Sequence, residues 1–565
     1  MKIFFEKNWF HLLLLNIFTT CVFLLNFEFK PFILEWKIST IFSWVSWDLC
    51  LFFDKVSLLF FSMVSMVSIM VLKYAYSYMF NSKEWSQFIW TLICFILSML
   101  ILTSSGSLFW TLIGWDCLGL SSFCLVIFYQ SWKSWNSGMA TFMYNRFGDM
   151  MFFISLLILA FQWNSPSWLG SSESFFSYFL LFGTLTKSAQ IPFSAWLPLA
   201  MAAPTPVSAL VHSSTLVTAG IFVLCRFFSF LDDKSLIFLN FISLMTIILA
   251  GTSAMFEYDL KKIIALSTLS HIGFILFFLS IKSQEASLFH MFVHAFFKSL
   301  LFMSAGYLIH LESGKQDIRS LSINVFSDPY PWNIFSSAIF SMAGLPFFAG
   351  FYSKELMLLF SAKVESPIAL ISSIGFMLSV CLTCGYSFRL LSFLFSSKSF
   401  SFSKKAGLPQ SFKLPFFWGG LLSVFSGSIF LWIFLSPFSV SVVILNNPDL
   451  KGLLVFSMLL GGFLGFLSNF FFYNSTIFTL SIFLDQKWFI GSLGNLLNVT
   501  FFLSSFKMNS SMDLKGLYDE KEKLLIDSWK KSWFWTSWVF TTFSFLWVRA
   551  FIVFSSLIIF MIELN

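Results

Sequence analysis

The sequence has few charged residues. Asp, Glu, Lys and Arg make up 11% of its 565 residues, whereas a soluble globular domain carries about 25%. That proportion is too small to cover a water-soluble surface, so the composition excludes a soluble enzyme and a disordered chain. The 34 basic residues against 27 acidic ones give a net charge of +7, which is too modest for a nucleic-acid-binding protein.

The sequence also lacks the short motifs of common cofactor sites. It contains no Gly-rich dinucleotide loop after a strand, no phosphate-binding P-loop and no HExxH zinc motif. Its eight cysteines are scattered, and Cys381 and Cys384 form a lone C-x-x-C pair. Because a zinc or iron–sulfur site needs about four ligands, we expect no metal, flavin or nucleotide site on this chain.

Apolar residues, in contrast, are abundant. Hydrophobic residues make up 58% of the chain, including 83 Phe and 22 Trp, and the mean hydropathy is +0.83. A helix needs about 20 apolar residues to span a bilayer, so the length allows about sixteen spans. The composition predicts an all-α, polytopic membrane protein, and the Phe excess is typical of a T-rich organelle genome.

Apolar runs of spanning length recur between short polar connectors. The segment Met1–Phe29 has Lys2 and Lys7 around an apolar core but no small-residue cleavage site, so we expect a retained first span. Clear later runs are Gln87–Ser104, Leu108–Phe128, Val207–Phe227, Ile263–Ser280, Ile368–Phe388, Phe416–Leu435 and Leu453–Phe471.

The C-terminal part of the sequence has a different pattern. Between Asp513 and Lys531, apolar residues recur at three- and four-residue steps among charged ones. Asp519 and Asp527 each precede a Lys by four residues, which is the stabilising orientation on a helix. The pattern predicts an amphipathic helix along the membrane surface, followed by a last span over Trp535–Ile562.

Two apolar runs contain an ionisable residue near their middle. Such a residue costs about 2.5–3.5 kcal/mol at bilayer depth. Asp116 lies within Leu108–Phe128, and Lys187 precedes Pro192 within Phe179–Leu199. Proline favours a helix break there. Asp116 could hold two helices together or carry a proton, and in either case its partner must come from another helix.

A third run, Leu288–His310, carries His290, His294 and Lys298 at steps of four residues. Successive members drift by only about 40° around a helix, so they form a row about 12 Å long on one face. A single such His is typically a core residue. Three titratable groups on one stripe favour a proton relay.

A second interrupted run is Ile334–Phe360, in which Gly344, Pro346 and Gly350 precede Lys354 and Glu355. Two interrupted spans, each with a Lys, are typical of paired sites in transporters built from inverted repeats. The isolated His212 could link the two halves or could be a core residue.

These residues lie within motifs that resemble the antiporter-like membrane subunits of respiratory complex I. The resemblance is strong from about Asp54 to Arg389, and Leu484-Asp-Gln-Lys-Trp488 adds to it. The matching motifs are Gly114–Leu120, Asn145–Asp149, Thr186–Pro192, Trp196–Pro198, Pro204–Gly220, Asp259–Lys262, Ser267–Ser270, His290–Lys298 and Gly350–Glu355.

The resemblance implies a proton channel in the membrane arm of the mitochondrial inner-membrane complex, a proton-translocating NADH:ubiquinone reductase. NAD, FMN, iron–sulfur clusters and ubiquinone would belong to other subunits. Neighbouring antiporter-like subunits, contacted by the surface helix, and membrane lipids would be the partners, and no nucleic acid would bind.

The resemblance also assigns roles to single residues. Asp116 matches the acid paired with Lys187, and His212 matches the His between the half-channels. The remaining matches are Lys261 or Lys262 with His290, His294 and Lys298 for the central axis, Lys354 and Glu355 for the distal exit, and Arg146 and Asp149 for a charged pair beside the first half-channel.

Three positions depart from the family pattern. Asp116 stands where Glu is usual, so its carboxylate reaches about 1.5 Å less far and could pair with Lys187 through water. Leu199 replaces an acid found in many bacterial members, and His271 replaces a Gln.

The resemblance divides the chain into five parts: N-terminal helices at 1–104, half-channels at 105–230 and 231–395, further helices at 396–480, and the surface helix with its anchor at 481–565. Two other functions stay open. One is a subunit of a multi-subunit cation/proton antiporter, and the other is a structural subunit with a decayed channel. The retained Lys187, Lys298 and Lys354 argue against the decayed channel, because each is expensive in a membrane.

Overall fold

The computed structural model describes residues 32–36, 49–80, 82–164, 169–312, 314–320, 329–362, 367–396, 410–434 and 448–468. The predicted first span at Met1–Phe29, the surface helix at Asp513–Lys531 and the last span at Trp535–Ile562 lie outside these residues. The chain divides into two compact units, Met1–Val364 with Ser372–Ile490, and Glu365–Ile371 with Gly491–Asn565. The description below concerns the first unit.

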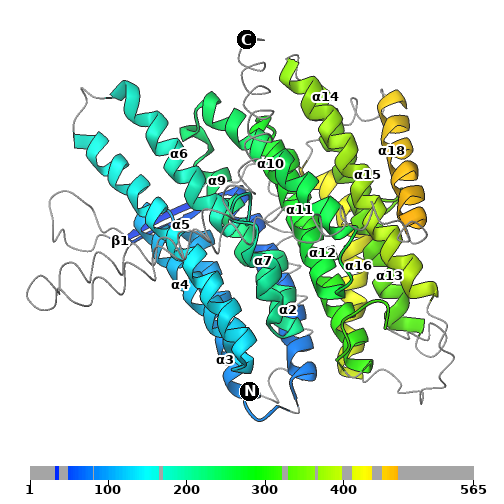
Figure 1. Ribbon diagram of the computed structural model, residues 1–565. Helices are drawn as coiled ribbons and strands as arrows, with labels where there is room; N and C mark the ends of the chain where they lie inside the picture. The colour runs from blue at the N-terminus through cyan, green and yellow to red at the C-terminus, as the bar shows by residue number, and fades with distance from the viewer. Residues whose placement is uncertain are drawn as a thin grey trace, which may run out of the picture. The chain divides into compact units, whose positions relative to one another are not determined.

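The described part of the chain is almost entirely helical, as predicted (Figure 1). A small antiparallel sheet of β1 (Phe32–Trp36) and β2 (Leu49–Phe53), in which Phe32 pairs with Phe53, was not predicted. The main helices are α2 (Lys55–Tyr78), α3 (Trp85–Ser104), α4 (Leu108–Val126), α5 (Trp132–Asn164), α6 (Leu169–Lys187), α7 (Trp196–Leu199), α8 (Thr205–Val207), α9 (Leu216–Arg226), α10 (Asp233–Ala254), α11 (Leu260–Ser280), α12 (Gln284–Leu311), α13 (Pro329–Ala343), α14 (Ala349–Ala362), α15 (Pro367–Ser396), α16 (Gln410–Phe434) and α18 (Pro448–Ser468).

Within the described residues, ten helical stretches are long and apolar enough to cross a membrane. This confirms a polytopic, all-α membrane fold, while the total of about sixteen spans stays a prediction. The five-part division of the chain also stays a prediction.

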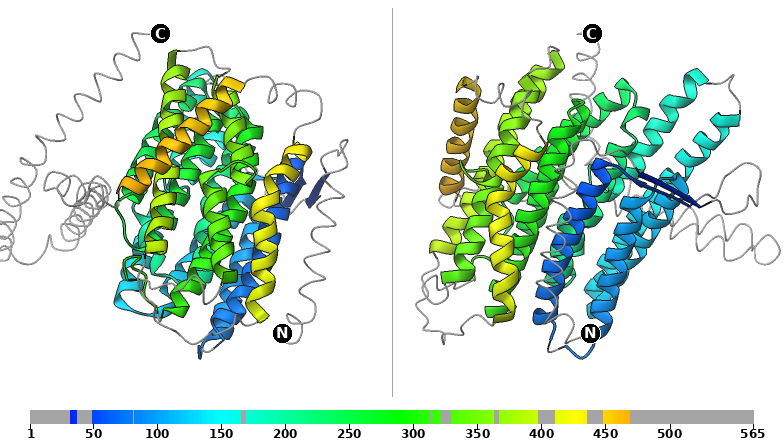
Figure 2. Two further views of the ribbon diagram at one scale, coloured as in Figure 1. Left: turned by 90° about the vertical axis from the view of Figure 1, so that its right-hand side faces the viewer. Right: turned by 180° about the vertical axis from the view of Figure 1, so that it is seen from behind.

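Three of the ten stretches form the centre of the unit. Every residue in the most apolar window of Thr205–Arg226, Leu260–Ser280 and Gln284–Leu311 is buried, whereas only 33% of that window is buried in Lys451–Ser468. Figures 1 and 2 show α11 and α12 side by side among the other helices, with α18 at one edge. A helix that is apolar on all sides belongs in such a centre, and any polar side chain on it must find partners inside the protein.

Both predicted helix interruptions are present. Helix α6 ends at Lys187, and the chain turns through Pro192 before α7. Helix α13 ends at Ala343, Gly344 adopts a φ of +82° and α14 starts at Ala349. A side chain at Gly350 would collide with the carbonyl oxygen of Ser341, so glycine lets the two half-helices approach closely.

A third irregularity was not predicted. The central span that contains His212 begins as the short helix α8, continues as a π-helical segment, Ser208–Thr215, and ends as α9. A π-helical segment inside a helix is rare and is frequently found at a functional site.

Candidate functional site

The first interruption buries Lys187 against α4. The Lys187 side chain is fully buried, and its Nζ donates to the carbonyl oxygen of Trp115 at 2.5 Å. The same ammonium lies 3.8 Å from the centroid of the Trp115 ring, which in turn stacks on Phe152 at 5.2 Å. The ammonium is therefore held by a carbonyl dipole and an aromatic face at the C-terminus of α6, where the helix dipole favours a cation.

Asp116 finds its partner on another helix, as the sequence requires. Its carboxylate lies 3.9 Å from the Arg146 guanidinium of α5, and the same guanidinium lies 3.3 Å from the carboxylate of Asp149. Both acids interact electrostatically with Lys187, but the direct contact of Lys187 is the Trp115 carbonyl. A direct Asp116–Lys187 pair therefore stays a prediction.

Sequence reasoning missed a buried polar link that leaves the first interruption. The Gln190 side-chain amide donates to the carbonyl of Ser188 at 3.1 Å, and Thr246 of α10 donates to Gln190 Oε1 at 2.5 Å. Thr246 in turn packs against Gly273 of α11, where an added Cβ would meet its hydroxyl at 3.0 Å. The signal in the sequence was Gln190 itself, a polar residue inside the interrupted span.

His212 lies in the π-helical segment with its ring fully inside the protein. Within the described part of the chain, neither ring nitrogen has a hydrogen-bond partner. The ring faces Trp196 at 6.1 Å between centroids, and Trp196 donates to the carbonyl of Thr186 at 2.9 Å, beside Lys187. His212 is thus placed next to the first interruption.

Of the two alternatives that the sequence left open, Lys261 is the buried one. Its Nζ donates to the carbonyl of Ala203 at 3.2 Å, next to the segment that carries His212. Lys262 lies instead at the surface, where it forms a 2.6 Å ion pair with Asp259.

The centre of the site is a column of three buried histidines. His271 Nδ1 lies 3.1 Å from His290 Nε2, and His290 Nδ1 lies 2.9 Å from the Ser353 hydroxyl. The His271 and His290 rings stack at 5.3 Å, and the His294 ring lies 5.7 Å from that of His271. Neighbouring imidazoles and hydroxyls that both donate and accept hydrogen bonds can pass a proton between them.

Two buried lysines flank this column. Lys298 of α12 donates to the Ser267 hydroxyl at 2.5 Å and to the Met342 sulfur at 3.2 Å. Lys354 of α14 donates to the Met342 carbonyl at 3.1 Å, and also to the Ala343 carbonyl at 2.8 Å and the Thr383 hydroxyl at 3.1 Å. Met342 therefore touches both lysines, one with its side chain and the other with its backbone.

The second interruption explains why Lys354 can be buried. The last carbonyl groups of α13 have no partner within their own helix, and they form the negative end of its dipole. The ammonium of Lys354, on the half-helix α14 that follows, lies at this end of α13 and binds its carbonyl groups. The break at Gly344 thus creates the acceptors that hold the ammonium.

Glu355 points to a different neighbour. Its buried carboxylate lies 2.9 Å from the Nζ of Lys451 on α18. Sequence reasoning missed Lys451, because it lies just before an ordinary apolar run and outside every recognised motif. No role was predicted for Ser267, Ser353, Met342 or Thr383. Ser267 and Ser353 lie within the motifs Ser267–Ser270 and Gly350–Glu355, whereas nothing distinguishes Met342 and Thr383 from the many other Met and Thr residues of the apolar helices.

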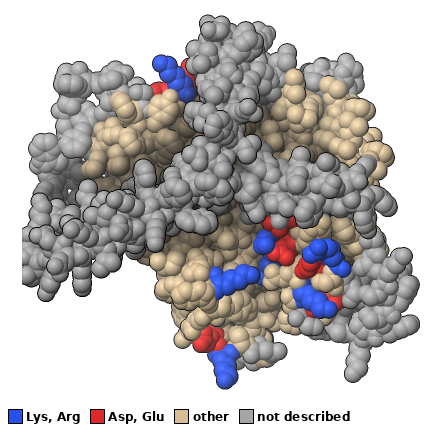
Figure 3. Space-filling view, in the orientation of Figure 1, with Lys and Arg blue, Asp and Glu red and all other residues tan. Residues whose placement is uncertain are grey.

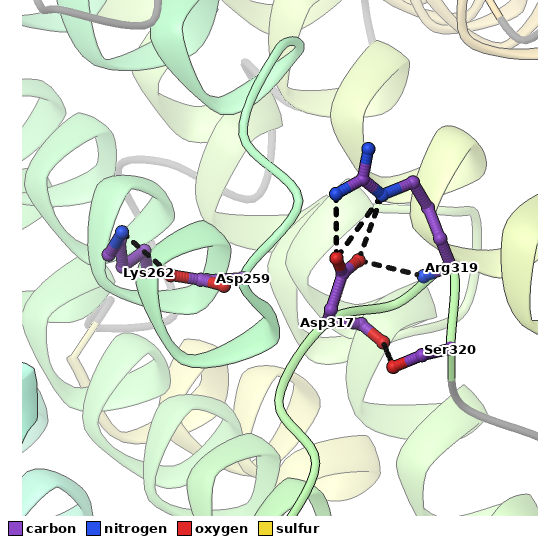
Figure 4. Close-up of polar contacts among 5 residues, drawn as sticks. All are labelled: Asp259, Lys262, Asp317, Arg319 and Ser320. Carbon is purple, nitrogen blue, oxygen red and sulfur yellow. Dashed lines mark hydrogen bonds and ion pairs between the residues drawn. The ribbon is translucent and has the colours of Figure 1, made fainter.

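A charged cluster lies at the surface between two loops. The segments at 258–260 and 316–318 pair through Leu260 N–H to Gln316 and Ile318 N–H to Tyr258. Figure 4 shows Asp317 bound by Arg319 beside the Asp259–Lys262 pair. On the face drawn in Figure 3, most of the visible Lys, Arg, Asp and Glu residues lie in the lower half. Hydrogen bonds from the Arg319 side chain hold the pKa of Asp317 below its ordinary value.

Across the described ranges, no group of three or more His, Cys, Asp or Glu is arranged to hold a metal ion. Cys381 and Cys384 are free thiols on α15.

Comparison with known proteins identifies the family. Residues 105–383 match the family described as NADH:quinone oxidoreductase/Mrp antiporter, TM. NADH-ubiquinone oxidoreductase chain 5 of Aedes aegypti is 40% identical over 507 residues, which cover 86% of this chain and 85% of the relative. The chain belongs to the NADH-ubiquinone oxidoreductase chain 5 family. The chain 5 of Locusta migratoria is also 40% identical, over 459 residues and 78% of each chain.

A solved structure shares the fold of this chain 5 family member. The structure of the Mrp complex from Dietzia sp. DQ12-45-1b superposes with a TM-score of 0.70 at 21% identity, covering 87% of this chain and 57% of that one. The family match at 105–383 includes both helix interruptions and the histidine column. Lys451 lies beyond it.

Proposed function

We propose that this chain is the proton-translocating, antiporter-like subunit of a respiratory NADH:ubiquinone oxidoreductase in the mitochondrial inner membrane. The observation that carries the proposal is the buried line of titratable side chains between the two helix interruptions. Lys187, His294 and Lys354 are all fully buried within a unit made of membrane-spanning helices. Such residues are expensive in a membrane and typically mark ion pathways or proton relays.

The contacts support a path in two parts. In the first part, Asp116, Arg146 and Asp149 set the charge around Lys187. Lys261 and His212 belong to the same part and lie on the buried central spans. In the second part, Lys298 lies one helical turn after His294 on α12 and donates to Ser267 of α11, the helix of His271. The histidine column leads through His290 and Ser353 to α14. Lys354 and Glu355 end the line. The Gln190–Thr246 link is a further connection between the two parts.

Electrostatic repulsion would couple the steps. Lys298 and Lys354 are both held by Met342, so a proton on one disfavours a proton on the other in the low-dielectric interior. Moving one proton against 100 mV requires about 2.3 kcal/mol, and one pKa unit corresponds to about 1.4 kcal/mol. A few coupled changes of this size are sufficient for transport.

The energy would come from redox chemistry on other subunits. In this proposal NADH oxidation and ubiquinone reduction take place elsewhere in the complex, and neighbouring antiporter-like subunits and membrane lipids are the partners. A surface helix at 513–531 that contacts those neighbours remains part of the proposal.

The shared fold with the Mrp complex structure favours one alternative, a subunit of a multi-subunit cation/proton antiporter. The two functions differ in the proteins with which the chain would assemble. Purification of the chain from its native membrane within an NADH-oxidising assembly supports the proposal, whereas purification within an assembly that exchanges cations for protons without NADH oxidation favours the alternative.

The roles of the buried lysines are tested by Lys187→Met and Lys354→Met. We expect each to lower NADH-driven proton pumping per assembled complex by about a hundredfold or more, the scale on which proton-transferring side chains contribute. Lys282→Met is the matched control, because Lys282 forms an exposed ion pair with Asp233 at the surface. Full proton pumping in both of the first two variants would contradict the assignment.

A further inference from the structure

The Glu355–Lys451 ion pair joins the interrupted helix to the edge helix α18. The Glu355 side chain is 9% exposed and the Lys451 side chain 35% exposed, with 2.9 Å between their charged atoms. The pair borders a small hollow lined by Phe351, Leu358, Leu359 and Leu454. The acid is thus inside the protein, while its cation reaches it from the rim.

The position of Lys451 is fixed by close packing of α18 on α15. A Cβ at Gly461 would collide with the carbonyl oxygen of Cys381, and one at Gly465 would collide with that of Gly385. Two small residues four positions apart, facing two others with the same spacing, are typical of tight helix packing in membranes. Lys451 lies on the same helix, so this packing determines which residue of α14 its side chain contacts.

Glu355 and Lys354 are consecutive, so they leave α14 about 100° apart. Lys354 turns to the end of α13 and to Thr383, whereas Glu355 turns to α18. At the end of the buried line, Lys354 therefore contacts the protein interior, whereas Glu355 contacts a partly exposed residue of the edge helix α18.

We propose that Lys451 is a positioning residue for proton release, which holds the Glu355 carboxylate in place at the outer end of the line through a direct ion pair. This inference rests on the proposed function. A hydrogen bond between two opposite charges is strong and directional, so the Lys451 ammonium fixes the direction in which the Glu355 carboxylate points. Without that ammonium, the Glu355 carboxylate loses its ion-pair partner and is no longer held toward α18, at the end of the path from Lys354.

The test compares Lys451→Met with Lys451→Arg in membrane vesicles that hold the assembled complex. We expect NADH-driven proton pumping per complex to fall by about threefold to fivefold in Lys451→Met, the size expected for a lost, partly exposed ion pair. Lys451→Arg keeps the cation and should retain at least about half of the rate. Adding Lys451→Met to Glu355→Gln should cause no further loss, and Lys282→Met should pump normally.

Two results would overturn the proposal. One is normal pumping per complex in Lys451→Met. The other is an equal loss in Lys451→Met and Lys451→Arg, which would show that Lys451 only packs. The Lys354→Met variant distinguishes failure of the role of Lys451 from failure of the proposed function. If Lys354→Met stops pumping while Lys451→Met pumps normally, only the role of Lys451 fails, and if Lys354→Met pumps normally, the proton path itself fails.

Discussion

Lys187 and Lys354 share one way of keeping a cation inside the membrane. Each ammonium lies near the C-terminal end of a half-helix, Lys187 at the end of α6 and Lys354 beside the end of α13. Lys187 donates to the carbonyl of Trp115 within α4, and Lys354 donates to the last carbonyls of α13, those of Met342 and Ala343. A free helix end offers about half an elementary charge. This offsets part of the cost of burial without an acid in direct contact.

Asp317 provides a pH-dependent test away from the membrane interior. Arg319 lowers the pKa of Asp317 in the folded protein, so the interaction is fully present above the ordinary value of 3.8 and is lost as the pH falls through the lower folded value. We expect Asp317→Asn to lower the thermal unfolding midpoint slightly at pH 7, because Asp317 is well exposed. The difference from the unsubstituted protein should vanish below the folded pKa, and a difference that stays constant down to that pH would contradict this account.

The sequence located some site residues and not others for a physical reason. Lys298 and His290 stand out because a charged or titratable group in an apolar run is rare, and their four-residue spacing places them on one helix face. Ser353 and Thr383 do not stand out, since a hydroxyl on an apolar helix can satisfy itself on its own backbone, as Ser299 does. Only the fold brings Ser353 within reach of His290.

At the scale of elements, glycine decides how closely the edge helix can pack. Gly461 lies against the backbone of α15, whereas Gly452, nine residues earlier on the same helix, has nothing near its missing side chain. The two positions therefore form a natural pair for substitution.

We expect Gly461→Ala to destabilise the protein and Gly452→Ala to leave it unchanged or slightly more stable. An alanine stabilises an exposed helix by about 0.5–1 kcal/mol relative to glycine, but at Gly461 the added methyl group must push α18 away from Cys381. Thermal unfolding of the purified complex gives the comparison. Equal effects of the two substitutions would show that α18 does not pack tightly on α15.

The helix interruptions were predictable, but the π-helical segment was not. Pro192 in the first span, and Gly344 with Pro346 in the second, break a helix by known local rules. The run Val207–Phe227, by contrast, predicts one regular span, and the change to π-helical turns at Ser208–Thr215 has no comparable local marker. The strand pair β1–β2 was missed because its apolar residues resemble those of the helices.

At the scale of the whole molecule, burial separates two classes of lysine. Lys187, Lys298 and Lys354 are fully buried, whereas the side chain of Lys262 is 41% exposed and that of Lys282 is 60% exposed. An amine-reactive ester should therefore modify Lys262 and Lys282 in the native protein and reach the other three only after unfolding. Peptide mass spectrometry measures this, and modification of any of the three at the rate of Lys282 would contradict the buried arrangement.

The carbonyl groups of Met342 and Ala343 form a cage around Lys354, and this cage determines the sign of the change in charge when Lys354 binds a proton. Peptide dipoles carry no net charge, so the cage is neutral when the amine is empty and gains one full positive charge when a proton arrives. A cage closed by a carboxylate would instead alternate between negative and neutral. In the proposed path, a proton that arrives at Lys354 would therefore repel nearby cations and attract nearby anions.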